Sequence, residues 1–144
     1  MTKKTLAYKG AVSINQSDTN GHMNVMHYIN KYELAAMNMF TDVGYTRLYA
    51  KENNLGIIIL EQQIKYYKEL FEDDTIYIES HISSLARKVV QITHELYNGD
   101  TKELSGTAVI TYAFLNKEIR KTVLIPDSIK NKLEDLLMPQ KVEK

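Results

Sequence analysis

The stretch Ser17-Asp18-Thr19-Asn20-Gly21-His22-Met23-Asn24 separates two segments of different periodicity and thereby decides the fold. Residues 8–15, before it, include the apolar Ala11, Val12 and Ile14 and predict a short strand. After it, apolar residues recur every three or four positions over residues 24–44, which predicts a long amphipathic helix that ends at Gly44. The predicted apolar stripe of this helix consists of Val25, Ile29, Tyr32, Ala36, Met39 or Phe40, and Val43.

The loop itself brings a carboxylate, two amides, a glycine and an imidazole to the start of a helix. The first N–H groups of a helix have no partner within it, and they lie at the positive end of its dipole. Asp18 beside such N–H groups would supply the parts needed to attack, or to deprotonate near, a polarised carbonyl group. The same residue types are also ordinary cap and turn residues, so on this pattern alone both interpretations stay open.

The composition is that of one globular domain spanning residues 1–144. Hydrophobic residues make up 44% of the chain and charged residues 25%, both close to the averages of folded proteins. The formal net charge is zero, so broad electrostatic binding of nucleic acid or of an anionic membrane is not expected. An anionic ligand would need a local cluster of basic side chains.

The chain contains no cysteine. This excludes thiolate nucleophiles, dithiol redox chemistry and cysteine-ligated zinc, and it fits a reducing compartment. The N-terminal residues are basic but no apolar run follows them, so they do not resemble a signal peptide. No segment approaches the ~20 apolar residues that span a bilayer. We therefore expect a soluble, cytoplasmic protein.

The rest of the chain predicts four strands flanked by two short helices. Residues 46–53 and 126–137 have helical character, whereas residues 55–67, 75–84, 89–98 and 104–115 alternate and are joined by short, turn-rich connections. The predicted apolar faces are Ile58, Leu60, Ile64 and Tyr66; Ile76, Ile78 and Ile82; Val90, Ile92 and Leu96; Ala108, Ile110, Tyr112 and Phe114; and, on the last helix, Ile129, Leu133, Leu136 and Leu137. Met23, Met26, Met37 and Met39 lie in or beside the first helix and are predicted to fill the core.

This order of elements predicts an α+β fold. A long apolar helix placed between the first strand and four antiparallel strands fits best against the concave face of a single curled sheet. The opposite face and the edges of that sheet remain uncovered, so we expect the chain to form dimers or larger assemblies.

The motif Asp18-x-x-Gly21-His22-Met23-Asn24-x-x-x-Tyr28 resembles that of hotdog-fold acyl-CoA thioesterases of the 4-hydroxybenzoyl-CoA thioesterase-like group. The run Leu60-Glu61-Gln62-Gln63-Ile64-Lys65-Tyr66 resembles a second-strand segment of one branch of these enzymes, and the similarity covers residues 6–120. The resemblance implies a hotdog fold, with a long central helix wrapped by a curled antiparallel five-stranded sheet and a short C-terminal helix. It also implies an acyl-CoA substrate and a homodimer or homotetramer.

By this resemblance, Asp18 matches the catalytic carboxylate, which acts as nucleophile or as general base on water. Asn24 and Val25 match the helix start whose backbone N–H groups bind the thioester oxygen. The sequence departs from the family pattern at Gln16, where an acid is often found, and at Val25, where many relatives carry Asn or His. These departures bear on the rate and on the range of substrates.

The roles of the other candidates stay open. His22 could bind substrate or fix the loop, and Glu61 could be a second acid across a dimer or an ordinary surface residue. Tyr28 and Met26 are candidates for lining the acyl site, and Arg87 and Lys88, in a tight turn, are candidates for binding the CoA phosphates. A metal site of Asp18, His22 and His27 lacks a fixed helical spacing, so no metal is expected; nor is any cofactor, since CoA is part of the substrate.

These features favour an enzyme that hydrolyses an acyl-CoA thioester to a free acid and CoA. One alternative is an enoyl-CoA hydratase or hydroxyacyl dehydratase of the same fold. Its Asp-x-Asn-Pro-x-His pattern places the histidine five residues after the acid, whereas His22 follows Asp18 by four and no proline is present. The other alternative is an acyl-binding hotdog module without catalytic activity, which the residues at Gln16 and Val25 keep open.

Overall fold

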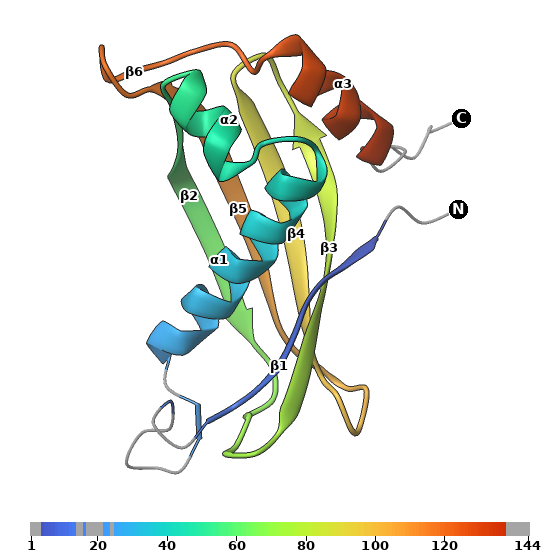
Figure 1. The fold of residues 1–144 in the computed structure, drawn as a ribbon. Coiled ribbons are helices and arrows are strands. Elements are labelled where there is room, and N and C mark those ends of the chain that lie inside the picture. The colour runs from blue at the N-terminus through green and yellow to red at the C-terminus, as the bar shows by residue number, and fades with distance from the viewer. Residues whose placement is uncertain (1–3, 14–15, 17–21, 24, 138–144) are drawn as a thin grey trace, which may run out of the picture.

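The computed structural model describes residues 4–13, 16, 22–23 and 25–137, with Val25 described by its backbone. Figure 1 shows a curled antiparallel sheet with three helices, the last of them short. The elements in chain order are β1 (Thr5–Ala11), α1 (Val25–Asp42), α2 (Arg47–Glu52), β2 (Leu55–Tyr66), β3 (Thr75–Leu85), β4 (Val89–Asn98), β5 (Leu104–Asn116), β6 (Lys121–Thr122) and α3 (Asp127–Leu136). This confirms the predicted α+β class.

The strands form one sheet in the order β1-β3-β4-β5-β2, and every neighbouring pair is antiparallel. The prediction of five strands is therefore incomplete, because the two-residue strand β6 also pairs with the end of β5. A strand of two residues has no measurable alternation, so the sequence pattern gave no signal for it. The first strand begins at Thr5, earlier than predicted, and ends at Ala11.

Helix α1 has 18 residues and lies across one face of the sheet (Figure 1). Its predicted stripe is confirmed at Tyr32, Ala36, Met39, Phe40 and Val43, which are all buried. Gly44 follows the helix with a φ of 97°, the left-handed conformation in which glycine commonly ends helices. Among the described residues, no helix is both long and apolar enough to cross a membrane.

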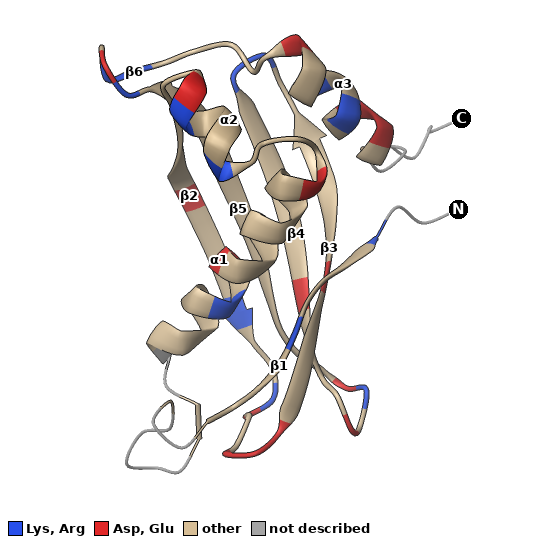
Figure 2. Cartoon of the chain, in the orientation of Figure 1, with Lys and Arg blue, Asp and Glu red and all other residues tan. Residues whose placement is uncertain are grey.

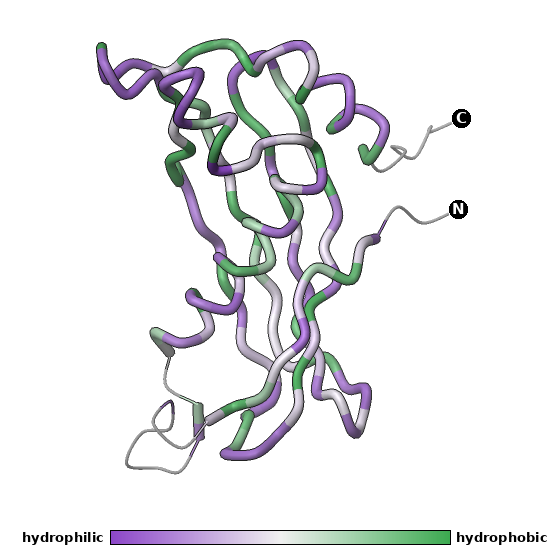
Figure 3. Tube along the Cα trace, in the orientation of Figure 1, coloured by the Kyte–Doolittle hydropathy of each residue, from purple (hydrophilic) through white to green (hydrophobic). Residues whose placement is uncertain are grey.

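The inner face of the sheet is formed mainly by β3, β4 and β5. The predicted apolar residues of these strands are confirmed as buried, and they form one core with α1 and with Ile129 and Leu133 of α3. Figure 3 shows the matching alternation of apolar and polar residues along the strands, with hydrophilic connections at the lower end. Burial of this face is the main source of stability, at about 25 cal/mol for each Å² of apolar surface.

The predicted face of β2 is wrong because the strand contains a bulge. Its register against β5 shifts between Ile59 and Glu61, so that Leu60 has no directly opposed residue. Opposed residues share a face, so Ile57 and Ile59 face inward before the bulge, whereas Ile64 faces inward after it. Ile58 therefore lies on the opposite face from Ile64 and Tyr66, and Leu60 lies at the bulge itself.

The prediction that all four methionines fill the core is also wrong. Met23 and Met39 are buried, but 65% of Met26 and 60% of Met37 is exposed. Both exposed residues lie on α1 outside its buried stripe. The pattern overestimated the width of that stripe, because methionine was counted as apolar at every position.

Candidate functional site

Backbone hydrogen bonds attach the residue after β1 and a residue just before α1 to one short segment, the β2–β3 connection of residues 67–74. After β1, the Val12 N–H donates to the Asp74 carbonyl at 2.9 Å, and the Asp73 N–H donates to the Val12 carbonyl at 2.8 Å. Before α1, the Met23 N–H donates to the Leu70 carbonyl at 2.7 Å. Val12 and Met23, which precede and follow the predicted polar loop in sequence, are therefore both attached to the β2–β3 connection. Asp18 and Asn24 lie outside the described residues.

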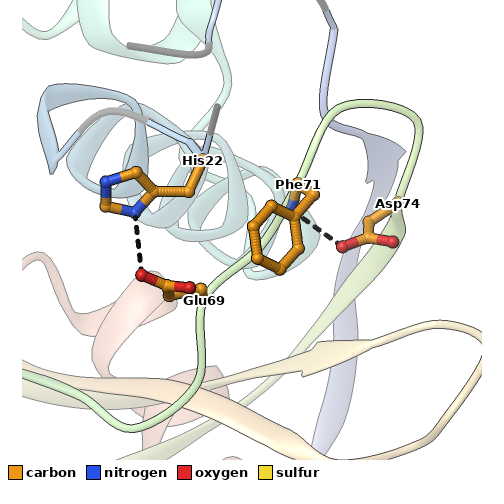
Figure 4. Close-up of polar contacts among 4 residues, drawn as sticks. All are labelled: His22, Glu69, Phe71 and Asp74. Carbon is orange, nitrogen blue, oxygen red and sulfur yellow. Dashed lines mark hydrogen bonds and ion pairs between the residues drawn. The ribbon is translucent and has the colours of Figure 1, made fainter. Parts of the chain in front are cut away.

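The β2–β3 connection is itself stabilised by local hydrogen bonds. The Phe71 N–H donates to Asp74 Oδ2 at 2.8 Å, as Figure 4 shows, and the Asp74 N–H donates to the Phe71 carbonyl at 3.0 Å. Asp73 has a φ of 71°, a left-handed conformation that aspartate tolerates better than most residues. The connection is therefore a defined turn on which the neighbouring segments are built.

His22 lies directly on this connection and forms an isolated antiparallel bridge with Phe71. Its ring is directed towards Glu69, with 3.8 Å between Nδ1 and Glu69 Oε1 (Figure 4). This distance is longer than a hydrogen bond, and the two groups form an ion pair only when the imidazole is protonated. His22 is partly accessible, so its ring can contact a ligand as well as the loop.

A cavity of about 220 Å³ lies beside His22 and the first turns of α1. It is lined by residues of three elements: His22, Met23 and Tyr28 at and after the loop, Tyr66 at the end of β2, and Tyr67, Lys68 and Glu69 of the β2–β3 connection. We call it the His22 cavity. The edge of one ring in the Tyr28–Tyr66 pair faces the other, at 4.9 Å between centroids, and burial raises the pKa of Tyr28 to about 12. Tyr28 thus presents a neutral phenol at this cavity.

The structure does not bring every predicted site residue to this cavity. Met26 lies outside the described cavities and is exposed. Glu61 is also exposed, and it is opposed to Thr111 on the sheet face that points away from α1. Simple alternation would place Glu61 on the same face as Ile57 and Ile59, but the bulge between Ile59 and Glu61 puts it on the opposite face.

Arg87 and Lys88 lie at the opposite end of the molecule. They occupy the turn between β3 and β4, beside α3, where Figure 2 shows basic residues. The 11 residues of β3 separate this turn from the β2–β3 connection, a path of about 35 Å in an extended strand. Both residues are exposed, and Arg87 lines a shallow cavity with Lys130 and Glu134 of α3. Within one chain they are remote from His22.

A buried polar network in the core was not identified from the sequence. His94 Nδ1 lies 2.6 Å from Ser80 Oγ, and His94 Nε2 lies 3.2 Å from the Tyr112 hydroxyl. Burial lowers the pKa of His94 to about 3, so the imidazole is neutral. A signal was present in the sequence, because His94 occupies an inward position in the alternation of Val90, Ile92 and Leu96.

Among the described residues, no three histidine, aspartate or glutamate side chains gather as they would around a metal ion. The metal site considered from the sequence includes Asp18, which lies outside those residues.

Comparison with known proteins gives a family match. A family profile described as "Thioesterase-like superfamily" matches residues 12–133, which is most of the chain. The match includes the polar loop, α1 and all strands after it. No curated protein matches the chain in sequence.

Solved structures share the fold at low sequence identity. A Staphylococcus aureus protein determined in complex with CoA is 18% identical, with a TM-score of 0.88 over 100% of this chain and 92% of its own. A 1,4-dihydroxy-2-naphthoyl-CoA thioesterase from Synechocystis is 12% identical, with a TM-score of 0.81 over 91% of this chain and 96% of its own. A gentisyl-coenzyme A thioesterase is 17% identical, with a TM-score of 0.79 over 88% and 98%.

Proposed function

Because the chain belongs to the thioesterase-like superfamily and is a thioester hydrolase, we propose that it hydrolyses an acyl-CoA to a free acid and CoA. The neighbours named as CoA thioesterases, and the one solved with CoA, support CoA as the thiol part of the substrate. The observation that carries this proposal is the attachment of both β1 and α1 to the β2–β3 connection. The two attached residues, Val12 and Met23, flank in sequence the segment that contains Asp18, and Met23 also lines the His22 cavity.

The proposed chemistry uses Asp18 and the start of α1. The Asp18 carboxylate either takes a proton from a water molecule that attacks the thioester carbon, or attacks that carbon itself and forms a mixed anhydride that water then hydrolyses to the free acid. The backbone N–H groups at Asn24 and Val25 stabilise the oxyanion, and the C–S bond then breaks to release CoA as the thiol. A positioned acid or base typically contributes ~10²–10⁴-fold in rate. One oxyanion donor contributes ~10²–10³-fold.

We further propose that α1 serves as the long central helix of a hotdog fold and that β2 forms the contact between copies. β2 is an edge strand of 12 residues, and its exposed apolar residues include Ile59, Leu60 and Tyr66. An edge strand with this surface favours pairing with a second copy in a homodimer or homotetramer. In such an assembly, the CoA phosphates contact Arg87 and Lys88 of another copy, and Glu61 is available as a second acid. We propose a cytoplasmic location.

The test is the Asp18→Asn variant, which keeps the size of the side chain and removes its basicity. Thiol release is measured across a panel of acyl-CoA substrates for the wild type, for this variant and for the control Asp42→Asn at the exposed end of α1. We expect turnover to fall by ~10² or more in Asp18→Asn, with the free energy of unfolding unchanged. Equal activity in wild type and Asp18→Asn would refute the role of Asp18.

The same panel separates the competing functions. Loss of the enoyl absorbance from an unsaturated acyl-CoA without thiol release would indicate hydration. Binding of acyl-CoA without any turnover would indicate a module that has lost catalysis.

A further inference from the structure

Lys31 of α1 is buried, which is unusual for a lysine. Only 4% of the residue is exposed, although lysine is among the residues least often found inside folded proteins. The other buried polar residues are Ser80, His94 and Ser105, and burial lowers the pKa of His94 to about 3, so that none of these three is charged at neutral pH. Among the residues that the structure describes, Lys31 is therefore the buried residue that carries a formal charge.

The Lys31 side chain lies against β1. Its Nζ atom donates to the Tyr8 hydroxyl at 3.4 Å and lies 5.6 Å from the centroid of the Tyr8 ring. Tyr8 in turn lies over Gly10, where a side chain would collide with the tyrosine hydroxyl. The ammonium group is thereby held between α1 and the last residues of β1.

No carboxylate offsets this charge within the described part of the chain. The ion pairs of that part join other residues. Glu79 of β3 and Glu95 of β4 alternate with buried residues and therefore lie on the outer face of the sheet, away from α1. Glu33 of α1 lines a cavity on the side of β2. A buried charge without an opposite charge costs stability, so the needs of the fold alone do not account for Lys31.

The Lys31 ammonium group lies near the start of α1. Asn38, seven residues later, donates to the Ala7 carbonyl at 2.6 Å, so the end of β1 lies beside the first turns of α1, as Figure 1 shows. Lys31 follows Val25 by six residues, about 9 Å along a helix, and helical Cα–Cβ bonds tilt back towards the helix start. The positive charge is therefore within about 10 Å of the first N–H groups of α1.

A positive charge in this place favours negative charge at the helix start. At about 10 Å and an effective dielectric constant of about 20, the attraction corresponds to a factor of about 10 in an equilibrium or rate constant. It adds to the helix dipole, whose positive end lies at the same place. The oxyanion of thioester hydrolysis carries a charge that the thioester does not, so this attraction lowers the barrier more than it improves substrate binding.

Building on the proposed function, we propose that Lys31 stabilises the negative charge that develops on the acyl group at the start of α1. Lys31 does not touch the reacting atoms, and it acts through its charge. The proposal separates activity from stability, because the charge that assists the reaction is the one that costs the fold.

The variant is Lys31→Met, which keeps a long apolar side chain and removes the charge. We expect kcat to fall by about 10-fold with KM little changed, and the free energy of unfolding to stay the same or rise. Lys31→Arg keeps the charge and should retain most of the activity. The control is Lys9→Met on β1, where the lysine is exposed and its charge is screened by solvent.

A binding measurement tests the same charge without turnover. Calorimetry compares S-carboxymethyl-CoA, which carries a carboxylate in the acyl position, with the neutral S-acetonyl-CoA of similar shape. Relative to S-acetonyl-CoA, we expect S-carboxymethyl-CoA to bind about 10-fold more weakly to Lys31→Met than to the wild type. Lys9→Met and Lys31→Arg should keep the wild-type ratio of the two affinities.

The outcomes distinguish this inference from the proposed function. Absence of thiol release from every protein would refute the proposed function, while the ratio of the two affinities would still report on Lys31. An unchanged ratio in Lys31→Met would overturn the inference. A marked loss of stability in Lys31→Met would overturn it as well, because Lys31 would then be a structural residue.

Discussion

Strands β4 and β2 both alternate between apolar and polar residues, yet the structure uses them in opposite ways. In β4, every second residue from Val90 to Leu96 is buried against α1 and the neighbouring strands. In β2, the alternation is interrupted by a bulge, and much of the strand after Ile58 is exposed. β4 lies in the middle of the sheet, whereas β2 is at its edge.

The difference shows that alternation predicts a strand but not which residues the fold buries. The inner face of β4 is buried within the chain, including the polar side chain of His94, which has partners on both ring nitrogens. β2 retains apolar side chains that no described residue covers, among them Leu60 at 54% exposed. These side chains are available to a ligand or to a second copy.

The largest expected effect is on stability. Ile92→Ala in β4 removes a fully buried side chain, and we expect it to lower the free energy of unfolding by about 2–5 kcal/mol. Leu60→Ala in β2 removes a side chain that is mostly exposed in one chain, and we expect a change of about 0.5 kcal/mol or less. Urea denaturation at one protein concentration measures both. Equal losses for the two variants would contradict the contrast between the strands.

A smaller effect is expected on how the free energy of unfolding depends on pH, through the buried His94. An unfolded histidine titrates near 6.5, whereas burial lowers the pKa of folded His94 to about 3. Between these values the unfolded state binds the additional proton, so the free energy of unfolding falls as the pH decreases. We expect His94 to contribute a loss of about 2 kcal/mol between pH 7 and pH 5.

Denaturation of wild type and His94→Gln at these two pH values isolates this contribution. The variant keeps a polar side chain but has no imidazole to protonate, so its dependence on pH should be weaker by that amount. His81, whose pKa burial also lowers, is present in both proteins and cancels in the comparison. The same pH dependence in both proteins would show that His94 does not have the lowered pKa.

The smallest effect on folding is expected for Leu60→Lys. We expect the free energy of unfolding of a single chain to change by about 0.5 kcal/mol or less, whereas the proposed contact between copies should weaken. Light scattering coupled to size-exclusion chromatography measures the mass in solution. Ile119→Lys, with 58% of its side chain exposed in the β5–β6 turn, is the control. An unchanged assembly in Leu60→Lys would place the interface elsewhere.

Most of the fold could be predicted because its signals are periodic. The spacing of apolar residues predicted α1, the inner faces of β3, β4 and β5, and both buried residues of α3. Thr46, at the start of a predicted short helix, accepts a hydrogen bond from the Tyr49 N–H at 3.0 Å as a cap. The β2 bulge could not be predicted in this way, because one inserted residue reverses the faces without changing the composition.

The candidate site could be predicted only in part. The loop motif identified His22 and Tyr28, which the structure places at one cavity, whereas Arg87 and Lys88, predicted from a separate turn, lie far from them within one chain.

The attachment of β1 and α1 to a single turn has a consequence for how this scaffold can diversify. Since Val12 and Met23 are held by neighbouring residues of one connection, the residues between them can change in number and kind while their two attachment points stay in place. Insertions there need not disturb strand pairing elsewhere in the sheet. Segments with other functional side chains can therefore replace the residues between these two points. The connection of residues 70–74 has to stay the same in such a replacement.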